Sequence, residues 1–333
     1  MGVQRFARSG RVFRGAAVGA IFTLLVCSCS SGGQYASVDA TAARSEVASQ
    51  VAAPPGPTEV LGVVKDPVTW SVPFDRVLDG NLSRLENYAY DLLVDRCMSE
   101  AGIDEYEVMT ASSVPFPETS PHGNETLFNV EIAQKYGYRM APDPAYKISW
   151  EKIDLQGGGY YDGKPDSFKD QWHDCQDEVQ LELYGPPPTE YLDIDENGVI
   201  PIESQLNQFF VDTSSSQLQE AAAQWRTCMA PQGIADLPEE PWEVGTLDLP
   251  ESLITRFDYW PTGDPSADEI VVATADAECR ESSGWTSLLY EATWDQQAAF
   301  VADHQAEIEG MVAENEAEAA RMRSIITEAG GTP

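Results

Sequence analysis

The spacing of apolar residues predicts a mainly helical chain. Leu82, Leu85, Ala89 and Leu92 are three or four positions apart, which places them on one face of a helix over 82–101. Apolar spacing and end signals predict further helices over 125–136, 167–184 and 203–228, the last interrupted near 214–216, and one that opens at Ser266 and carries Cys279. Stretches rich in proline and glycine separate these helices, so we expect long irregular loops and a short hairpin near 192–200.

The longest helical pattern covers 285–329. A seven-residue repeat runs through it, and most of its a and d positions are apolar. These positions are Trp294, Ala298, Val301, Gln305, Ile308, Val312, Asn315, Ala319, Met322 and Ile326. We expect a long C-terminal helix that packs as an antiparallel coiled coil on other helices of the same chain. The alternative is a helix offered to a partner or to a second copy.

The pattern Cys-Met-x-x-x-Gly-Ile occurs twice, at 97–103 and at 228–234. In the first copy Gly102 can adopt the left-handed conformation that ends a helix, which brings the flanking Met and Ile into apolar contact. In the second copy Pro231 disfavours the helical conformation of the residue before it, so that helix is expected to end near Cys228. Each copy is interpreted as a helix end that carries half of a disulfide.

Residues 1–28 have the features of an export signal. Four arginines precede an apolar run that is too short to span a membrane. The run leads into Val-Cys-Ser-Cys, which resembles the end of a bacterial lipoprotein signal; Cys29 is favoured over Cys27 because Ser28 before it is small. We expect lipidation of Cys29 and stable anchoring by more than one acyl chain; the alternative is an ordinary secretory signal. Residues 29–60, rich in Ser, Gly, Ala and Pro, would form a flexible tether.

Four cysteines remain in the exported part: Cys97, Cys175, Cys228 and Cys279. An even number in an oxidising compartment indicates two disulfides. Three pairings are open. Local closure favours Cys97–Cys175 with Cys228–Cys279, each stabilising the fold by roughly 4 kcal/mol. The cysteines are too far apart, and histidines too few, for a zinc site. The two bridges would staple two helical units, 61–190 and 191–333.

The net charge of −35 limits the partners that can be expected. It argues against nucleic acid, which needs basic patches, and against electrostatic attraction to anionic lipid headgroups. The simplest interpretation is a solvated surface. The alternative is a surface that attracts a cationic partner or a divalent ion.

One loop resembles a calcium site. Asp193, Asp195 and Asn197, followed by Gly198, match the first positions of an EF-hand-type loop. The match then ends, because Ser204 stands where a bidentate Glu is expected. Asn-Gly is also a strong hairpin-turn signal. A plain turn is the favoured interpretation of this loop, and a calcium site, with calcium as the cofactor, is the alternative.

The sequence contains no familiar catalytic motif: no nucleophile elbow, phosphate-binding loop, dinucleotide-binding glycine pattern or zinc-protease motif. His173, Asp174 and Cys175 are adjacent but would point in different directions on a helix. Paired carboxylates of a glycan hydrolase are expected by chance among 55 acids. Aromatic residues of the predicted loops would either stack on cell-wall sugars or close over a helical core: Tyr146, Trp150, Tyr160, Tyr161, Trp242, Tyr259 and Trp260.

The order of these motifs resembles a group of secreted proteins and lipoproteins of actinobacteria. The shared order is Cys-Met-x-x-x-Gly at 97–102, Tyr136-Gly137-Tyr138, Cys175, a second Cys-Met-x-x-x-Gly at 228–233 and a final Glu278-Cys279. The resemblance covers most of 80–330 but rests on sparse motifs. It implies an exported, mainly helical, disulfide-stapled domain and supplies no catalytic residues.

Together these patterns predict a mainly α protein of two disulfide-stapled units with a long C-terminal helix. We expect a lipoprotein on the outer face of the cytoplasmic membrane, held there by its lipid. Its domain would be a non-enzymatic binding or scaffold module for an envelope protein or a cell-wall partner. The alternatives are a cell-wall glycan hydrolase and a calcium-dependent module.

Overall fold

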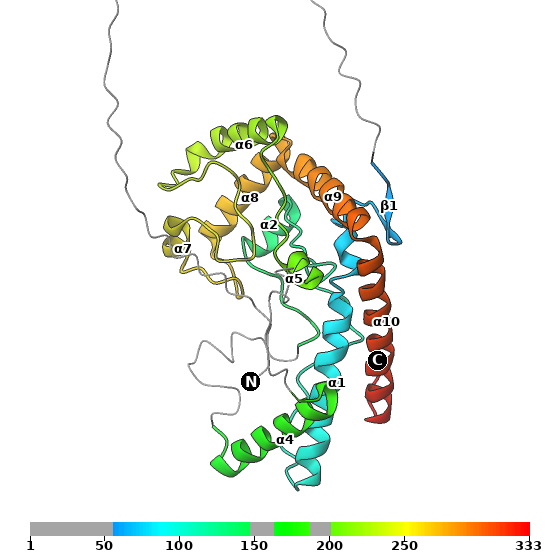
Figure 1. Cartoon of the computed structure of the whole chain (residues 1–333). Helices are drawn as coiled ribbons and strands as arrows, with labels where there is room; N and C mark the ends of the chain where they lie inside the picture. Colours follow the sequence, from blue (N-terminus) through cyan, green and yellow to red (C-terminus); the bar gives the residue numbers. More distant parts are fainter. Residues whose placement is uncertain (1–55, 147–162, 187–200) are drawn as a thin grey trace, which may run out of the picture. The chain divides into compact units, whose positions relative to one another are not determined.

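The computed structural model describes residues 56–146, 163–186 and 201–333. Over these residues the protein is mainly helical, as predicted, with one small antiparallel pair of strands (Figure 1). In chain order the elements are β1 (Glu59–Val60), β2 (Val63–Val64), the 3-10 helix η1 (Pro73–Arg76), α1 (Gly80–Glu100), α2 (Val130–Tyr136), α4 (Asp166–Tyr184), α5 (Ile202–Asn207), α6 (Ser216–Met229), the 3-10 helix η2 (Ala230–Gln232), α7 (Glu251–Phe257), α8 (Ala267–Ser282), α9 (Trp285–Asp303) and α10 (Gln305–Glu328).

The first Cys-Met-x-x-x-Gly-Ile segment ends α1 as predicted. Gly102 has a φ of 80°, in the left-handed region. The N–H of Ile103 donates to the carbonyl of Met98, and the N–H of Gly102 donates to that of Ser99, both at 2.9 Å. These two bonds define a Schellman motif, and Met98 is fully buried beneath it.

The second copy ends its helix less regularly. α6 stops at Met229, one residue beyond Cys228, and the short helix η2 carries the chain to Gly233, whose φ is 67°. Met229 is fully buried, and Ile234 packs against the same apolar cluster. The prolyl residue at 231 lies inside η2, where the tighter 3-10 turn accommodates it.

The predicted C-terminal helix is two helices. α9 and α10 meet at His304, whose φ of −119° and ψ of 25° leave the helical region. Seven of the eight apolar positions of the heptad repeat are nevertheless buried, and Val312 is half-buried. The buried residues are Trp294, Ala298, Val301, Ile308, Ala319, Met322 and Ile326. The repeat therefore identified the buried face and not the break.

α10 lies beside α1, and the two helices run in the same direction (Figure 1). The Asn315 amide, midway along α10, donates to the carbonyl of Val77, just before α1, at 2.8 Å. Gly331, just after α10, lies against Leu92, midway along α1. The expected antiparallel coiled coil is not confirmed, because the main helical neighbour of α10 is parallel to it. A heptad repeat marks the apolar face of a helix but does not encode the direction of its partner.

Both disulfides have the pairing favoured from the sequence. Cys97 on α1 is bonded to Cys175 on α4, and Cys228 on α6 is bonded to Cys279 on α8. Each bridge joins two helices that also pack against each other. The staples therefore reinforce existing helix contacts.

Two apolar clusters dominate the core. One surrounds Met98 between α1, α4 and α10, and the other surrounds Trp225 between α2, α6 and α8. Each joins helices from both of the predicted units, and all described residues belong to one compact unit. The predicted boundary at 190/191 lies outside the described residues.

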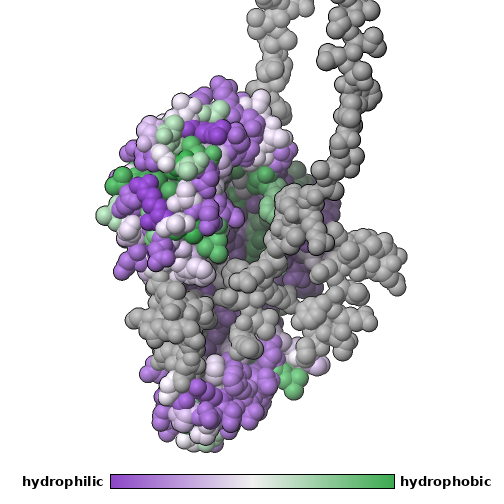
Figure 2. All heavy atoms as spheres, turned by 90° about the vertical axis from the view of Figure 1, so that its left-hand side faces the viewer, coloured by the Kyte–Doolittle hydropathy of each residue, from purple (hydrophilic) through white to green (hydrophobic). Residues whose placement is uncertain are grey.

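The end of the predicted tether belongs to the fold. Trp294 donates its indole N–H to the carbonyl of Pro57 at 2.7 Å, and β1 begins at Glu59. The predicted signal, the lipidation position Cys29 and the alternative Cys27 lie outside the described residues. On the face drawn in Figure 2, the surface is largely hydrophilic with small hydrophobic patches, in keeping with the excess of acids.

Candidate functional site

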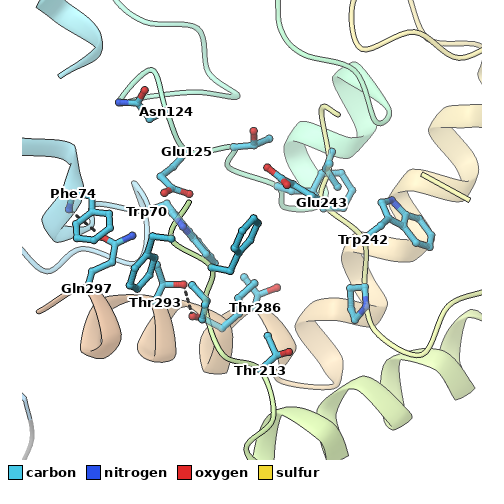
Figure 3. A pocket seen from close by; sticks show the side chains of 18 of the residues that line it. Trp70, Phe74, Asn124, Glu125, Thr213, Trp242, Glu243, Thr286, Thr293 and Gln297 are labelled. Atoms are coloured by element: carbon cyan, nitrogen blue, oxygen red, sulfur yellow. Dashed lines mark hydrogen bonds between the residues drawn. The ribbon is translucent and has the colours of Figure 1, made fainter. Parts of the chain in front are cut away.

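A cavity of about 710 Å3 lies where several parts of the chain meet. Its wall comes from η1 and the residues before it, the loop before α2, the segment 206–213, the loop 240–244 and one side of α9. Ligand sites in proteins commonly have volumes of roughly 300–1,000 Å3. The wall includes Trp70, Phe74, Asn124, Glu125, Phe128, Phe209, Phe210, Thr213, Glu240, Trp242, Glu243, Arg280, Trp285, Thr286, Thr293 and Gln297 (Figure 3).

Aromatic side chains form much of this wall. Phe74 and Phe209 pack edge to face, with ring centroids 4.9 Å apart. Phe210 next to them is 80% exposed. Trp70 has a φ of 56°, a conformation that large side chains rarely adopt, and its ring packs edge-on against Tyr290. Exposed aromatic faces of this kind suit a ligand with an apolar or a cationic group.

Two indoles in the wall have unused donors. Trp242 and Trp285 are 6% and 3% exposed, and neither indole N–H has an acceptor among the described residues. A buried donor without a partner costs about 1–3 kcal/mol. A hydrogen-bond acceptor on a bound ligand would relieve that cost if the rings turned toward it.

Two carboxylates face the cavity without a partner. Figure 3 shows Glu125, from the loop before α2, and Glu243, from the loop 240–244, directed into the same space. Within the described ranges neither carboxylate forms a hydrogen bond or an ion pair. Burial raises the pKa of Glu125 to about 7, and repulsion from Asp75 and Glu243 adds to the shift. The pKa of Glu243 is raised as well, first by partial loss of hydration and then by Asp248, although its side chain remains accessible to solvent.

Other polar groups of the wall are already engaged. Glu240 accepts from Thr213 at 2.8 Å and from Gln219 at 2.7 Å, which holds the segment 206–213 against the start of α6. Arg280, a cation in the wall, donates to Asp276 on α8 and to the carbonyl of Trp242, both at 2.9 Å. Its charge is therefore compensated within the protein. The described wall therefore offers no free cation to Glu125 and Glu243 when these two carboxyl groups are ionised.

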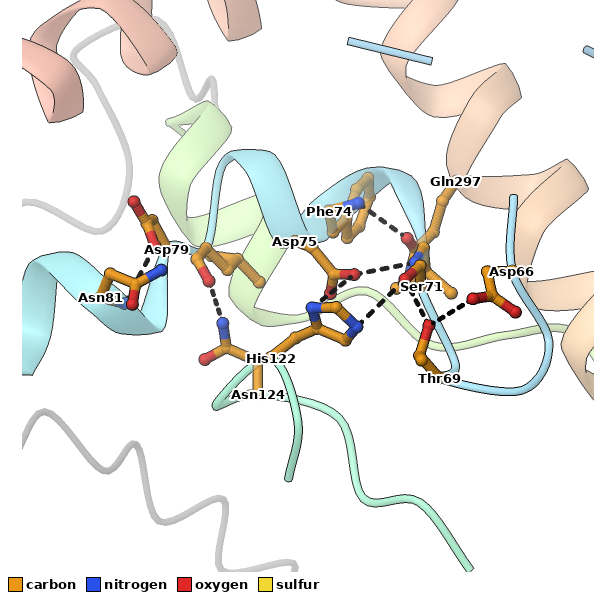
Figure 4. Close-up of polar contacts among 12 residues, drawn as sticks. Asp66, Thr69, Ser71, Phe74, Asp75, Asp79, Asn81, His122, Asn124 and Gln297 are labelled. Carbon is orange, nitrogen blue, oxygen red and sulfur yellow. Dashed lines mark hydrogen bonds and ion pairs between the residues drawn. The ribbon is translucent and has the colours of Figure 1, made fainter. Parts of the chain in front are cut away.

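A chain of polar contacts lies next to the cavity (Figure 4). The Ser71 hydroxyl is 3.0 Å from Nε2 of His122, and Nδ1 of His122 is 3.7 Å from Asp75. Thr69 continues the chain, because its hydroxyl contacts Ser71 at 2.9 Å and donates to Asp66 at 3.0 Å. Serine, histidine and aspartate in this order are the groups of a nucleophilic triad.

Acyl transfer also needs hydrogen-bond donors that stabilise an oxyanion, and the backbone N–H groups beside Ser71 are all engaged in other hydrogen bonds. The N–H of Ser71 donates to Asp66, that of Val72 to the Asp75 carboxylate, and that of Phe74 to Gln297. The intervening residue is a proline. Ser71 is also a buried residue, only 9% exposed. We therefore interpret the chain of contacts as a clip that ties the His122 loop to η1.

The structure places the residues singled out from the sequence in different roles. Among the aromatic residues, Trp242 lies in the cavity wall, Tyr259 is buried and bonded to the carbonyl of Tyr138, and Trp260 is 45% exposed. Trp150, Tyr160 and Tyr161 lie outside the described residues, as do the calcium candidates Asp193, Asp195 and Asn197. The described ranges contain no group of three potential metal ligands.

Sequence reasoning missed Glu125 and Glu243. Their raised pKa values could not be predicted from the sequence, because these values come from burial and from neighbours that only the fold supplies. The dipeptide Trp242-Glu243 in a proline-rich loop was the available signal. It places an aromatic ring and an acid together where chains often carry function.

Among the described helices, none is both long and apolar enough to cross a membrane. No family model, curated protein or solved structure matches this chain.

Proposed function

We propose that this protein is a non-enzymatic binding protein of the cell envelope, which takes its ligand into the cavity between η1, the loop 240–244 and α9. The observation that carries the proposal is an aromatic-walled cavity of about 710 Å3 with two carboxylates that have no partner in the described chain. A fold that needs Glu125 only for stability would pair its carboxyl group or leave it in open solvent, and here it is neither paired within the described residues nor fully exposed. The ligand is a small molecule, or a short part of an envelope protein or a cell-wall polymer.

The proposal includes attachment to the outer face of the membrane. It rests on the signal-like residues 1–28 and on the two disulfides, which persist in oxidising compartments. Metabolic labelling with a clickable palmitate analogue tests it in the native host. We expect Cys29→Ser to abolish labelling and Cys27→Ser to retain it. Labelling that survives Cys29→Ser would contradict lipidation at this position.

Ligand binding is tested by filling the cavity. Thr286 on α9 lines the cavity, and its neighbour Ser287 is exposed outside it. In a fragment screen by ligand-observed NMR, we expect hits that bind wild type and Ser287→Trp but not Thr286→Trp. The proposal fails if every hit binds Thr286→Trp as well as wild type while that variant remains folded.

A glycan hydrolase is the second candidate, and one observation favours it. Glu125 has a pKa of about 7, in the range of a general acid, and shares a cavity with a second carboxyl group, and glycoside hydrolysis uses a pair of carboxyl groups. Release of reducing ends from purified cell-wall glycan, lost in both Glu125→Gln and Glu243→Gln, would replace the binding proposal by this one. No release above the level of the double variant would leave binding as the function.

A further inference from the structure

The cavity combines three features that select a class of ligand. It has two carboxyl groups without a partner, Glu243 and Glu125, and Glu125 becomes negatively charged as the pH rises through its pKa of about 7. It also has aromatic faces from Trp70 and Phe209, and no uncompensated positive charge in the described wall. The two carboxylates also repel each other, since Glu243 contributes to the shifted pKa of Glu125. An anionic ligand would add to this repulsion, and a cation would remove it.

We propose that the cavity binds an organic cation, an alkyl- or arylammonium group that sits between the carboxylates of Glu125 and Glu243 and packs against the aromatic wall. The inference rests on the proposed function and names the ligand class of the same site. A positive charge over an aromatic face contributes about 0.5–2 kcal/mol, most when water is excluded. An apolar body on the cation would fill the remaining aromatic-lined volume.

A neutral sugar suits this wall less well. Sugars are held by many hydrogen bonds to free donors and acceptors, and much of the polar wall is occupied internally. Thr293 donates to the carbonyl of Leu289 at 2.8 Å, Gln297 accepts from the backbone of Phe74 at 3.0 Å, and Asn124 donates to the carbonyl of Leu78. The two carboxylates remain as the strongest free groups, and their preferred partner is a positive charge.

A bare metal ion would interact with fewer groups of the cavity wall than an organic cation. Divalent cations take several oxygen ligands, and no group of three potential metal ligands exists within the described ranges. The aromatic rings would contribute nothing to such an ion. An acceptor on an organic ligand, in contrast, could use the unpaired indole N–H groups of Trp242 and Trp285.

Two probes of the same shape test the charge directly. The cation is [4-(hydroxymethyl)phenyl]trimethylammonium and the neutral isostere is 4-tert-butylbenzyl alcohol, which differ only in nitrogen or carbon at one position and carry no group that titrates between pH 6 and pH 8. Titration calorimetry with the full domain at pH 8 should show the cation binding at least tenfold more tightly. The preference should disappear in the Glu125→Gln, Glu243→Gln double variant. It should persist in Glu278→Gln, which removes an exposed acid of α8 outside the cavity.

The pH dependence gives a second readout. Glu125 has a pKa of about 7, so it is mostly protonated at pH 6 and ionised at pH 8. Affinity for the cation should therefore rise between pH 6 and pH 8, with proton release on binding, and affinity for the neutral isostere should not. Glu125→Gln should flatten the rise while retaining weaker binding through Glu243.

The failures of the two proposals are distinguishable. Equal affinity for both probes, or fragment hits that are all neutral yet lost in Thr286→Trp, would overturn the cation inference and leave the cavity as a binding site. Calcium chloride alone giving a stabilisation that Glu125→Gln removes would also overturn it, in favour of a metal site. Absence of any binding that Thr286→Trp removes would overturn the proposed function itself.

Discussion

The side-chain partners of single residues in this protein cannot be predicted from the neighbouring residues in the sequence. Glu269 is the third residue of α8, the helix predicted to open at Ser266, and the Ser266 hydroxyl accepts from its N–H. Its carboxylate turns elsewhere, however. It is fully buried and accepts from Arg139 and from the backbone of Tyr138. The local signal therefore predicted the helix start, and tertiary packing decided what the side chain binds.

Glu125 gives a prediction at this scale about stability and pH. Its pKa is raised from 4.5 to about 7 in the folded protein, so the folded state holds a proton that the unfolded state releases above about pH 4.5. The unfolding free energy should fall as pH rises from about 5 to 7, because the carboxylate must then ionise in its part-buried site. Glu125→Gln cannot ionise, and this component of the pH dependence should be missing from it.

Thermal unfolding of the wild type and of Glu125→Gln between pH 5 and 8 measures the effect. We expect the thermal stability of the variant, relative to that of the wild type, to increase with rising pH. At pH 8 the variant should be the more stable protein. Parallel curves for the two proteins would contradict the raised pKa.

At the scale of elements, the helix ends are built from the same residue type but in different surroundings. Gly102 and Gly137 follow α1 and α2, with φ values of 80° and 61°. A Cβ at Gly102 would meet nothing within 4 Å, whereas a Cβ at Gly137 would lie 2.8 Å from the buried carboxylate of Glu269. Backbone strain applies at both positions, and a steric clash applies only at the second.

Alanine substitution separates these two costs. Gly102→Ala should lower the unfolding free energy by about 1 kcal/mol, the cost of a left-handed conformation for a residue with a side chain. Gly137→Ala should cost about 2–4 kcal/mol, because it also displaces the buried Glu269–Arg139 pair. Urea unfolding of both variants provides the comparison, and equal losses would show that the clash at Gly137 relaxes freely.

At the scale of the whole molecule, the fold joins helices that are far apart in the sequence. α10 packs its buried residues Ala319, Met322 and Ile326 against α1, and α2 packs against α8. The two predicted units therefore share both apolar clusters. The cavity depends on the same arrangement, since its wall takes η1 from one unit and α9 from the other.

Fragments test this dependence. A fragment of residues 201–333 would lack α1 and leave the apolar face of α10 exposed, and we expect it to show helical circular dichroism without a cooperative unfolding transition. The full domain from residue 56 onward should unfold cooperatively. A cooperative transition in the fragment alone would mean that the second predicted unit folds by itself.

The sequence by itself determined the helical class, the buried faces of most helices, the Schellman end at Gly102 and the favoured cysteine pairing. Each of these follows from local spacing or from short loop closure, which the order of residues contains. Only the tertiary structure decided the parallel packing of α10 on α1, the break at His304 and the cavity. These depend on residues far apart in the chain, as do the raised pKa of Glu125 and its proximity to Glu243. Burial and charge repulsion arise only once the chain has brought them together.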